Sequence, residues 1–170
     1  MAKVAKLGKR TDLRMSIIKN QASALVWYGK IETTLDRAKS VKSYVEKLLT
    51  LAINTYEDNV KVVKQVVDKK GVKSQKEVTV DGSKKLAARR KLMASLIDIQ
   101  EVRAEKESIQ SFRDRTMDIN HPIIEKMFNL YAPKYAKRAE EKGTKGGYTR
   151  IIRKNDRRGD GATTVILELI

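Results

Sequence analysis

Apolar residues follow a helical repeat in the first part of the chain. Thr11 and Asp12 can cap the start of a helix, and Gly29 is suited to end one. Between them apolar side chains recur every three or four positions, as one buried helix face requires. The stripe consists of Met15, Ile18, Ala22 and Leu25. The pattern predicts a helix that ends just before Gly29, with Arg14 and Lys19 lying away from the stripe.

A second and cleaner repeat comes after a short β-prone segment. Residues 30–33 favour a strand, and Thr33 with Asp36 approximates a capping box, in which two side chains bond the free amides of a first helical turn. The amphipathic helix that follows is predicted to bury one stripe. Its members are Ala38, Val41, Val45, Leu48 and Ala52.

The middle of the chain gives a weaker signal. Residues 60–67 and 77–80 read as valine-rich strands on either side of a turn at 69–71, closed by Asp81-Gly82, with an irregular or partly helical conformation as the alternative. Ser83 can cap a helix that runs to about Val102, with one apolar stripe. The stripe is Ala88, Leu92, Leu96 and Ile99. Residues 101–118 are highly charged and either extend this helix or form a mobile loop.

The last third predicts a helix and then a β-hairpin. Asn120-His121-Pro122 is a helix start, because proline in a first turn loses no needed hydrogen bond. Ile123, Met127 and Leu130 supply the expected stripe, and Pro133 bends or restarts the helix. Three glycines follow at 143, 146 and 147. Residues 148–154 and 163–170 then read as strands around a basic loop at 155–161, and Val165, Leu167 and Leu169 alternate as a buried strand face does.

The length of 170 residues favours one domain. Residues 1–10 alternate lysine with small and apolar residues and read as a basic N-terminal arm that orders on a partner. Residues 11–170 are predicted to form a single α+β domain.

Charge changes this picture because it is unevenly placed. The net charge is +16, and residues 1–30 hold seven cationic and one acidic side chain, while residues 143–161 hold six and two. These two stretches therefore carry +6 and +4. Cationic stretches beside apolar segments indicate a folded body that binds a polyanion, since neutralised phosphates release counterions and give sequence-independent affinity. Aromatic residues make up only 5% of the chain, which disfavours extensive base stacking.

Catalytic and metal-binding patterns are not found in the sequence. The chain has no cysteine, and its single histidine, His121, fits a capping or surface role. Gly143, Gly146 and Gly147 lack the lysine and hydroxyl residue of a phosphate-binding P-loop. No apolar run is long enough to span a bilayer, and no bulky apolar stripe opposes the basic residues. We therefore expect no enzyme activity, cofactor, metal, small-molecule substrate or membrane partner.

The basic residues near both ends are the candidate binding site. Arginine bonds phosphate oxygens with two N–H groups, and glycine lets a backbone approach a phosphate closely. For each single side chain, a solvated surface role is about as expected as phosphate contact. The predicted set is Lys3, Lys6, Lys9, Arg10, Arg14, Lys19, Arg37, Lys39, Tyr148, Arg150, Arg153, Lys154, Arg157 and Arg158.

Several motifs in order resemble a known family. They are Lys6-Leu7-Gly8-Lys9, Arg14, Asn20, Leu25, Lys30-Ile31-Glu32-Thr33-Thr34-Leu35, Arg37-Ala38-Lys39, Phe128-Asn129-Leu130, Gly146-Gly147-Tyr148-Thr149-Arg150-Ile151 and Arg157-Arg158-Gly159-Asp160. With them the chain resembles the family of the seventeenth protein of the bacterial large ribosomal subunit. The resemblance covers residues 6–56 and 123–170, and 84–98 more weakly.

That resemblance implies a two-layer α+β fold in the order α-β-α-α-α-β-β, closed by the C-terminal hairpin. It implies a cytoplasmic structural protein that binds large-subunit ribosomal RNA near the peptide exit side, beside other ribosomal proteins, mainly through phosphate. The alternative is a non-ribosomal protein that binds or compacts nucleic acid. The chain departs from the family pattern in three places. Expected histidines are absent near Arg14, Gly161-Ala162 stands where a proline is common, and residues 57–82 and 99–119 look like insertions.

Overall fold

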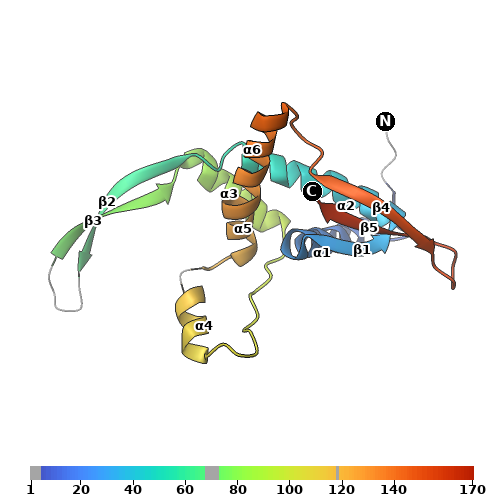
Figure 1. Cartoon of the computed structure of the whole chain (residues 1–170), viewed down its shortest axis with the longest axis horizontal. Coiled ribbons are helices and arrows are strands. Elements are labelled where there is room, and N and C mark those ends of the chain that lie inside the picture. Colours follow the sequence, from blue (N-terminus) through green and yellow to red (C-terminus); the bar gives the residue numbers. More distant parts are fainter. Residues whose placement is uncertain (1–4, 68–72, 118) are drawn as a thin grey trace.

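The computed structural model describes residues 5–67, 73–117 and 119–170. A three-stranded antiparallel sheet in the order β1-β5-β4 packs with helices, and a separate two-stranded ribbon, β2–β3, projects from the other end of the long axis (Figure 1). The predicted α+β class is confirmed, and the predicted order is contained in the observed one. The elements are α1 (Thr11–Tyr28), β1 (Lys30–Thr34), α2 (Leu35–Ile53), β2 (Asn59–Val67), β3 (Lys73–Asp81), α3 (Ser83–Ser95), α4 (Ile109–Thr116), α5 (Pro122–Lys126), a π-helical turn η1 (Met127–Tyr131), α6 (Ala132–Lys142), β4 (Thr149–Asp156) and β5 (Thr163–Leu169).

Helices α1 and α2 bury the two stripes that the sequence predicts. Ile18, Ala22 and Leu25 are buried in α1, with Met15 packed against them, and all five members of the α2 stripe are buried. Gly29 ends α1 as expected. Its φ of +80° is a left-handed conformation that favours glycine, and its N–H donates to the Leu25 carbonyl at 2.8 Å.

Both predicted N-terminal caps of these helices are wrong. Thr11 and Asp12 lie inside α1, whose N-cap is Arg10, and the Asp12 carboxylate accepts a hydrogen bond from Arg10 at 2.8 Å. Thr33 is the buried fourth residue of β1, where its hydroxyl accepts a hydrogen bond from Gln21 at 3.0 Å. Thr34 takes the N-cap position of α2 without a side-chain cap bond. At Thr33, strand pairing therefore overrides the local capping signal.

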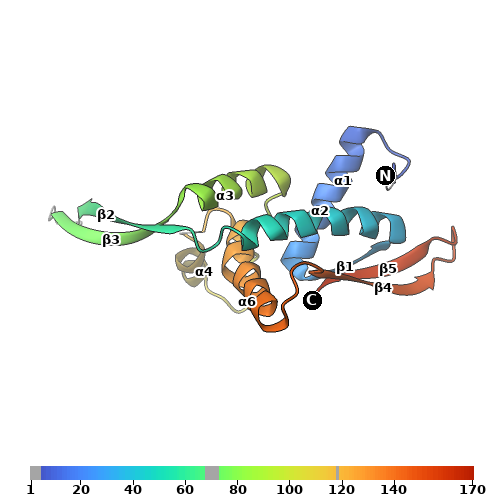
Figure 2. The same ribbon diagram turned by 90° about the horizontal axis from the view of Figure 1, so that it is seen from above.

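The three-stranded sheet forms one side of the hydrophobic core. Thr33 pairs with Val165 and Ile31 with Leu167, so the inward face of β1 meets the inward face of β5. Val165 and Leu167 are fully buried, and α2 contacts all three strands. Figure 2 shows α2 lying along the sheet. The alternation predicted for residues 163–170 is confirmed.

The β2–β3 ribbon confirms the hairpin reading of the middle segment. Val60 pairs with Val80 and Val62 with Val78, so four valines share one face. The predicted turn at 69–71 lies outside the described residues. Three of these valines are well exposed, at 49% for Val60, 41% for Val62 and 37% for Val80. The ribbon thus has little apolar burial of its own.

Polar contacts hold the base of the ribbon against α3. The Asp58 carboxylate accepts hydrogen bonds from the N–H groups of Lys84 (2.8 Å) and Lys85 (3.2 Å), and so caps α3. A Cβ on Gly82 would lie 2.4 Å from that carboxyl group, so only glycine leaves room for it. Asp81 bonds Lys85 (3.2 Å) and Arg89 (2.5 Å). Burial acts to raise the pKa of Asp81, but these two cations outweigh it and lower the pKa.

Helix α3 is shorter than predicted. Its N-cap is Gly82 rather than Ser83, and it ends at Ser95 rather than near Val102. Side chains from α1 and α2 bond the groups at its C-terminus. Lys19 donates to the Ala94 carbonyl (3.0 Å), Tyr44 donates to the Ser95 carbonyl (2.8 Å), and the Ser23 hydroxyl accepts from the Ile97 N–H (2.8 Å). Tertiary partners thus end the helix where local propensity would continue it. Of the two predicted alternatives for residues 101–118, neither holds as stated, because α4 is a separate short helix after an irregular segment.

Pro122 starts α5 as predicted, but the stripe that follows is only partly correct. Ile123 and Met127 are buried, whereas Leu130 is 52% exposed. The π-helical turn η1 inserts an extra residue into the helical repeat, so Phe128 and Tyr131 face the core in its place. Pro133 lies in the first turn of α6, which fits a restart. His121 is the N-cap of α5, but its side chain makes no cap bond; its Nδ1 lies 3.1 Å from Asp98.

Candidate nucleic-acid interface

The start of α1 and the tip of the β4–β5 hairpin lie at the same end of the long axis (Figures 1 and 2). Lys3 is outside the described residues. Lys6 and Lys9 are exposed in a turn, where the Lys9 N–H donates to the Lys6 carbonyl at 3.2 Å. Arg14 is half-buried. Lys6 and Lys9 are therefore accessible, whereas Arg10 is paired with Asp12 and Lys19 is bonded to α3.

Several arginines and lysines of the β4–β5 hairpin already have carboxylate partners. Arg150 lies 3.7 Å from Glu168 on the neighbouring strand, and Lys154 lies 2.9 Å from Glu32. Within the described parts of the chain, Arg153 and Arg158 have no ion-pair partner, and both are exposed. These two side chains are the most available cations of the hairpin.

An ion pair closes the hairpin loop. Arg157 donates to both carboxylate oxygens of Asp160, at 2.8 and 2.5 Å, and the Ala162 N–H donates to Asp160 at 3.2 Å. The hydrogen bond from Arg157 is the main reason that the pKa of Asp160 falls to about 2. Arg157 therefore shapes the loop as well as charging it.

Tyr148 is a core residue. It is only 5% exposed, its ring lies 4.9 Å from that of Tyr135, and the Arg138 guanidinium lies over it at 5.4 Å. A ring enclosed in this way is poorly placed to stack on a base. Arg37 and Lys39, by contrast, are exposed on α2.

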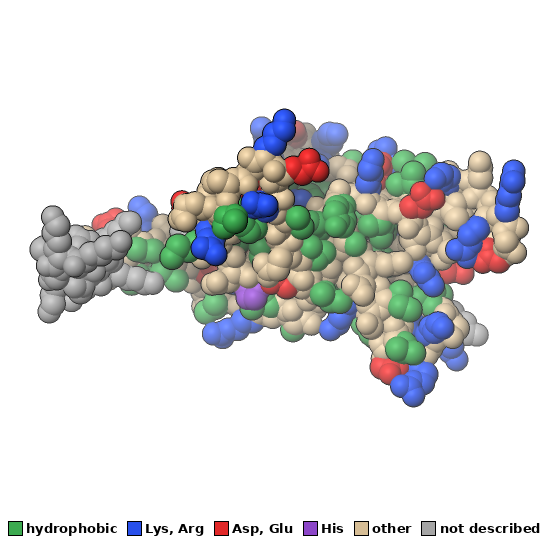
Figure 3. Space-filling model, turned by 90° about the horizontal axis from the view of Figure 1, so that it is seen from below, with side chains coloured by type: hydrophobic (Ala, Val, Ile, Leu, Met, Phe, Trp, Pro, Cys, Tyr) green, Lys and Arg blue, Asp and Glu red, His purple; other side chains and the backbone are tan. Residues whose placement is uncertain are grey.

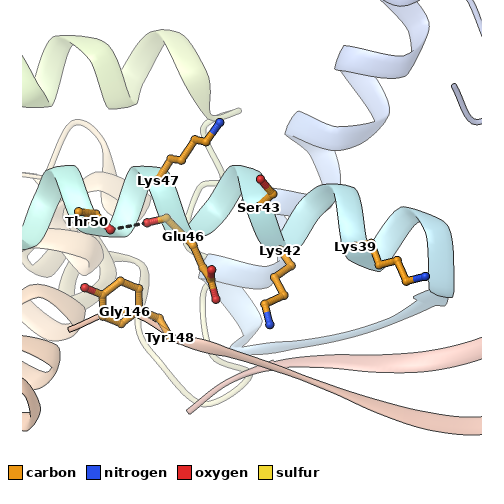
Figure 4. Close-up of a pocket in the computed structure, with 8 residues that line it drawn as sticks. All are labelled: Lys39, Lys42, Ser43, Glu46, Lys47, Thr50, Gly146 and Tyr148. Atoms are coloured by element: carbon orange, nitrogen blue, oxygen red, sulfur yellow. Dashed lines mark hydrogen bonds between the residues drawn. The ribbon is translucent and has the colours of Figure 1, made fainter. Parts of the chain in front are cut away.

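A groove runs between α2 and the segment that enters β4, and the predicted set covers only part of it. It has a volume of about 530 Å³. Figure 4 shows Lys39, Lys42 and Lys47 on α2 on one side and Gly146 with Tyr148 on the other. The sequence places Lys42 and Lys47 away from the apolar stripe of this helix, where a solvated surface role is about as expected as phosphate contact, and they are not in the predicted set. Helical spacing places Lys42 one turn after Lys39, but only the tertiary position of residues 143–148 makes these lysines the wall of a groove.

The face of the molecule seen in Figure 3 has many lysine and arginine side chains towards the β4–β5 end, and hydrophobic side chains nearer its centre. No group of three or more acidic, histidine or cysteine side chains that could hold a metal ion occurs in residues 5–67, 73–117 and 119–170. Across those same residues, no helix has the length and apolar character to cross a bilayer. The site can therefore offer positive charge and hydrogen-bond donors.

A helix-and-sheet body with clustered, exposed cations at one end belongs to the class of α+β proteins suited to binding a polyanion. Comparison with known proteins is more specific. The family described as Ribosomal protein L17 matches residues 17–170. The chain is 36% identical to the large ribosomal subunit protein bL17 of Lachnospira eligens over 189 aligned positions that cover all of both chains. It is 40% identical to that of Ruminiclostridium cellulolyticum over 190 positions, covering 97% of each. The chain belongs to the ribosomal protein L17 family, as the sequence resemblance predicted.

Proposed function

We propose that this chain is a non-catalytic structural constituent of the large ribosomal subunit in the cytoplasm. In this role it binds ribosomal RNA mainly through phosphate contacts and lies beside other large-subunit proteins. The observation that carries the proposal is the cluster of exposed cations on the N-terminal turn and the β4–β5 hairpin, in a chain of this family. Phosphate and sugar contacts position a protein by the shape of the RNA rather than by its base sequence.

The predicted binding set divides by its present partners. The free members are exposed and have no ion pair in the described residues, so they can contact phosphate without losing a partner. They are Lys6, Lys9, Arg37, Lys39, Arg153 and Arg158. The paired members must exchange a carboxylate for a phosphate oxygen. We expect the free members to contribute most of the affinity. The paired members are Arg10, Arg150, Lys154 and Arg157.

Salt dependence tests the phosphate mechanism. If six to ten phosphates are neutralised, the affinity for large-subunit RNA falls by roughly 10³ or more between 50 and 200 mM salt. Filter-binding titrations across that range measure the slope. Sedimentation of a cell lysate tests the location, because a ribosomal constituent stays with large subunits after a moderate-salt wash. A flat salt response contradicts the mechanism, and a position at the top of the gradient contradicts the ribosomal role.

A further inference from the structure

The lysines on the α2 wall of the groove have no carboxylate partner among the described residues. In the described part of the chain, none of Lys39, Lys42 and Lys47 has an ion-pair partner. In Figure 4, Lys42 extends towards β4, Lys39 extends along the helix, and Lys47 extends away from β4. Lys39 and Lys42 are three residues apart, about 4.5 Å along a helix that rises 1.5 Å per residue, so both can contact the same short stretch of a strand.

The acidic side chain in the groove is held away from these lysines. Glu46 accepts a hydrogen bond from the Thr149 hydroxyl at 2.8 Å, which ties its carboxylate to the start of β4. Because the partner of this carboxylate is a hydroxyl group rather than a lysine, the lysine charges stay available. An anion can therefore bind these lysines without breaking an existing ion pair.

Arg138 fixes the segment that forms the opposite wall. Its guanidinium lies over the rings of Tyr135 and Tyr148, at 5.1 and 5.4 Å, and donates to the Gly146 carbonyl at 2.6 Å. Gly146 and Tyr148 line the groove on this side. A Cβ built on Gly146 would meet no atom within 4 Å, so the wall is open at this residue.

We infer that this groove binds the phosphodiester backbone of one strand of the large-subunit RNA, with Lys39 and Lys42 supplying the positive charge on the α2 side. The inference rests on the proposed function and assigns it a second contact surface besides the β4–β5 loop. The open groove and its unpaired lysines suit a polyanionic strand. The buried Tyr148 ring offers no stacking platform, so we expect contact with the backbone rather than with bases.

A tethered cleavage probe locates the RNA directly. The chain has no cysteine, so Ser43→Cys, on the exposed groove wall, gives a single thiol for an iron chelate that generates hydroxyl radicals. Bound to large subunits that lack the native protein, this variant should cleave a strand of ribosomal RNA. Gly159→Cys in the β4–β5 loop reports the first contact surface independently. Cleavage from Gly159 but not from Ser43 overturns the groove and leaves the proposed function standing, whereas cleavage from neither contradicts both.

The salt slope counts the contacts. Lys39→Gln with Lys42→Gln should reduce the slope of log affinity against log salt by about 1.4 to 1.8, and weaken binding on the order of tenfold at physiological salt. Lys134→Gln with Lys137→Gln removes two exposed charges at the same spacing on α6 and is the control. Lys137 lies 3.9 Å from Glu141, an exposed pair that contributes little. Circular dichroism checks that both variants fold. Equal losses in the two variants would mean that the groove acts only through net charge, and would overturn the inference.

Discussion

The β2–β3 ribbon and the β4–β5 hairpin are both antiparallel pairs, yet they owe their order to different forces. In β5, Val165 and Leu167 are completely buried against α2, and β4 pairs with β5 at the edge of the same sheet. The ribbon leaves Val60, Val62 and Val80 exposed and is fixed at its base, where Asp58 and Asp81 bond α3. An isolated two-stranded pair is marginal in water. The hairpin is therefore part of the global fold, while the ribbon is a local unit whose position depends on a few polar contacts.

The largest effect should come from the core side of this comparison. Leu167→Ala removes a fully buried side chain and should lower the free energy of unfolding by about 2–5 kcal/mol. Val62→Ala, on the exposed ribbon face, should change it by no more than about 0.5 kcal/mol. Urea denaturation of both variants measures the two values. Similar losses would show that the ribbon valines are as important to the global fold as the core of the sheet.

A smaller and local effect is expected at the base of the ribbon. The methyl group of Gly82→Ala would displace the Asp58 carboxylate and remove the cap of α3, at a cost of about 0.5–2 kcal/mol. Amide hydrogen exchange should rise in β2, β3 and the first turn of α3, but not in β5. Gly159→Ala is the control, because a Cβ there meets no atom within 4 Å. In an Asp58→Ala background, Gly82→Ala should add little, and a full additional cost there would exclude this mechanism.

The smallest effect on stability is expected when low pH breaks the ion pair in the β4–β5 loop. The pKa of Asp160 is lowered to about 2 by Arg157, so the pair is intact above the ordinary value of 3.8 and is lost as pH falls through about 2. Because the pair is fully exposed, global stability should hardly change in that range. NMR titration of the Asp160 carboxyl carbon gives its pKa directly. Arg157→Gln should return that pKa towards 3.8, and an unchanged value would mean that the Ala162 N–H causes the shift.

Simple periodicity predicted the elements that pack by repetition. The stripes of α1 and α2 and the alternation of β5 are set by residues a few positions apart, so they are visible in the sequence. Helix ends are set by distant partners instead. Thr33 enters a strand, and Lys19 and Tyr44 end α3 from other helices. The contacts of Lys19 and Tyr44 join residues 75 and 51 positions apart, so they cannot be predicted from the local sequence.

The candidate site shows the same division. Charge clustering identified both basic ends, because composition alone reveals it. It could not show that Glu168 and Glu32 already neutralise Arg150 and Lys154, since the packing of the strands decides these pairs. The pair of Arg157 with Asp160 is local, but it depends on the conformation of the loop. Nor could it find the groove, which exists only where residues 143–148 pass α2.

The π-helical turn η1 changes which side chains of the helix face the core on either side of it. Each residue turns an α-helix by about 100°, so one inserted residue rotates everything beyond it by that angle. Within the turn, Phe128 lies beneath the Lys85 and Arg89 cations at the base of the ribbon, at 5.6 and 5.2 Å. After it, Tyr135 meets Tyr148 at the entrance to β4. Deleting one residue from the turn would force a choice between these partners, so the same helix could no longer secure the ribbon and the glycine segment together.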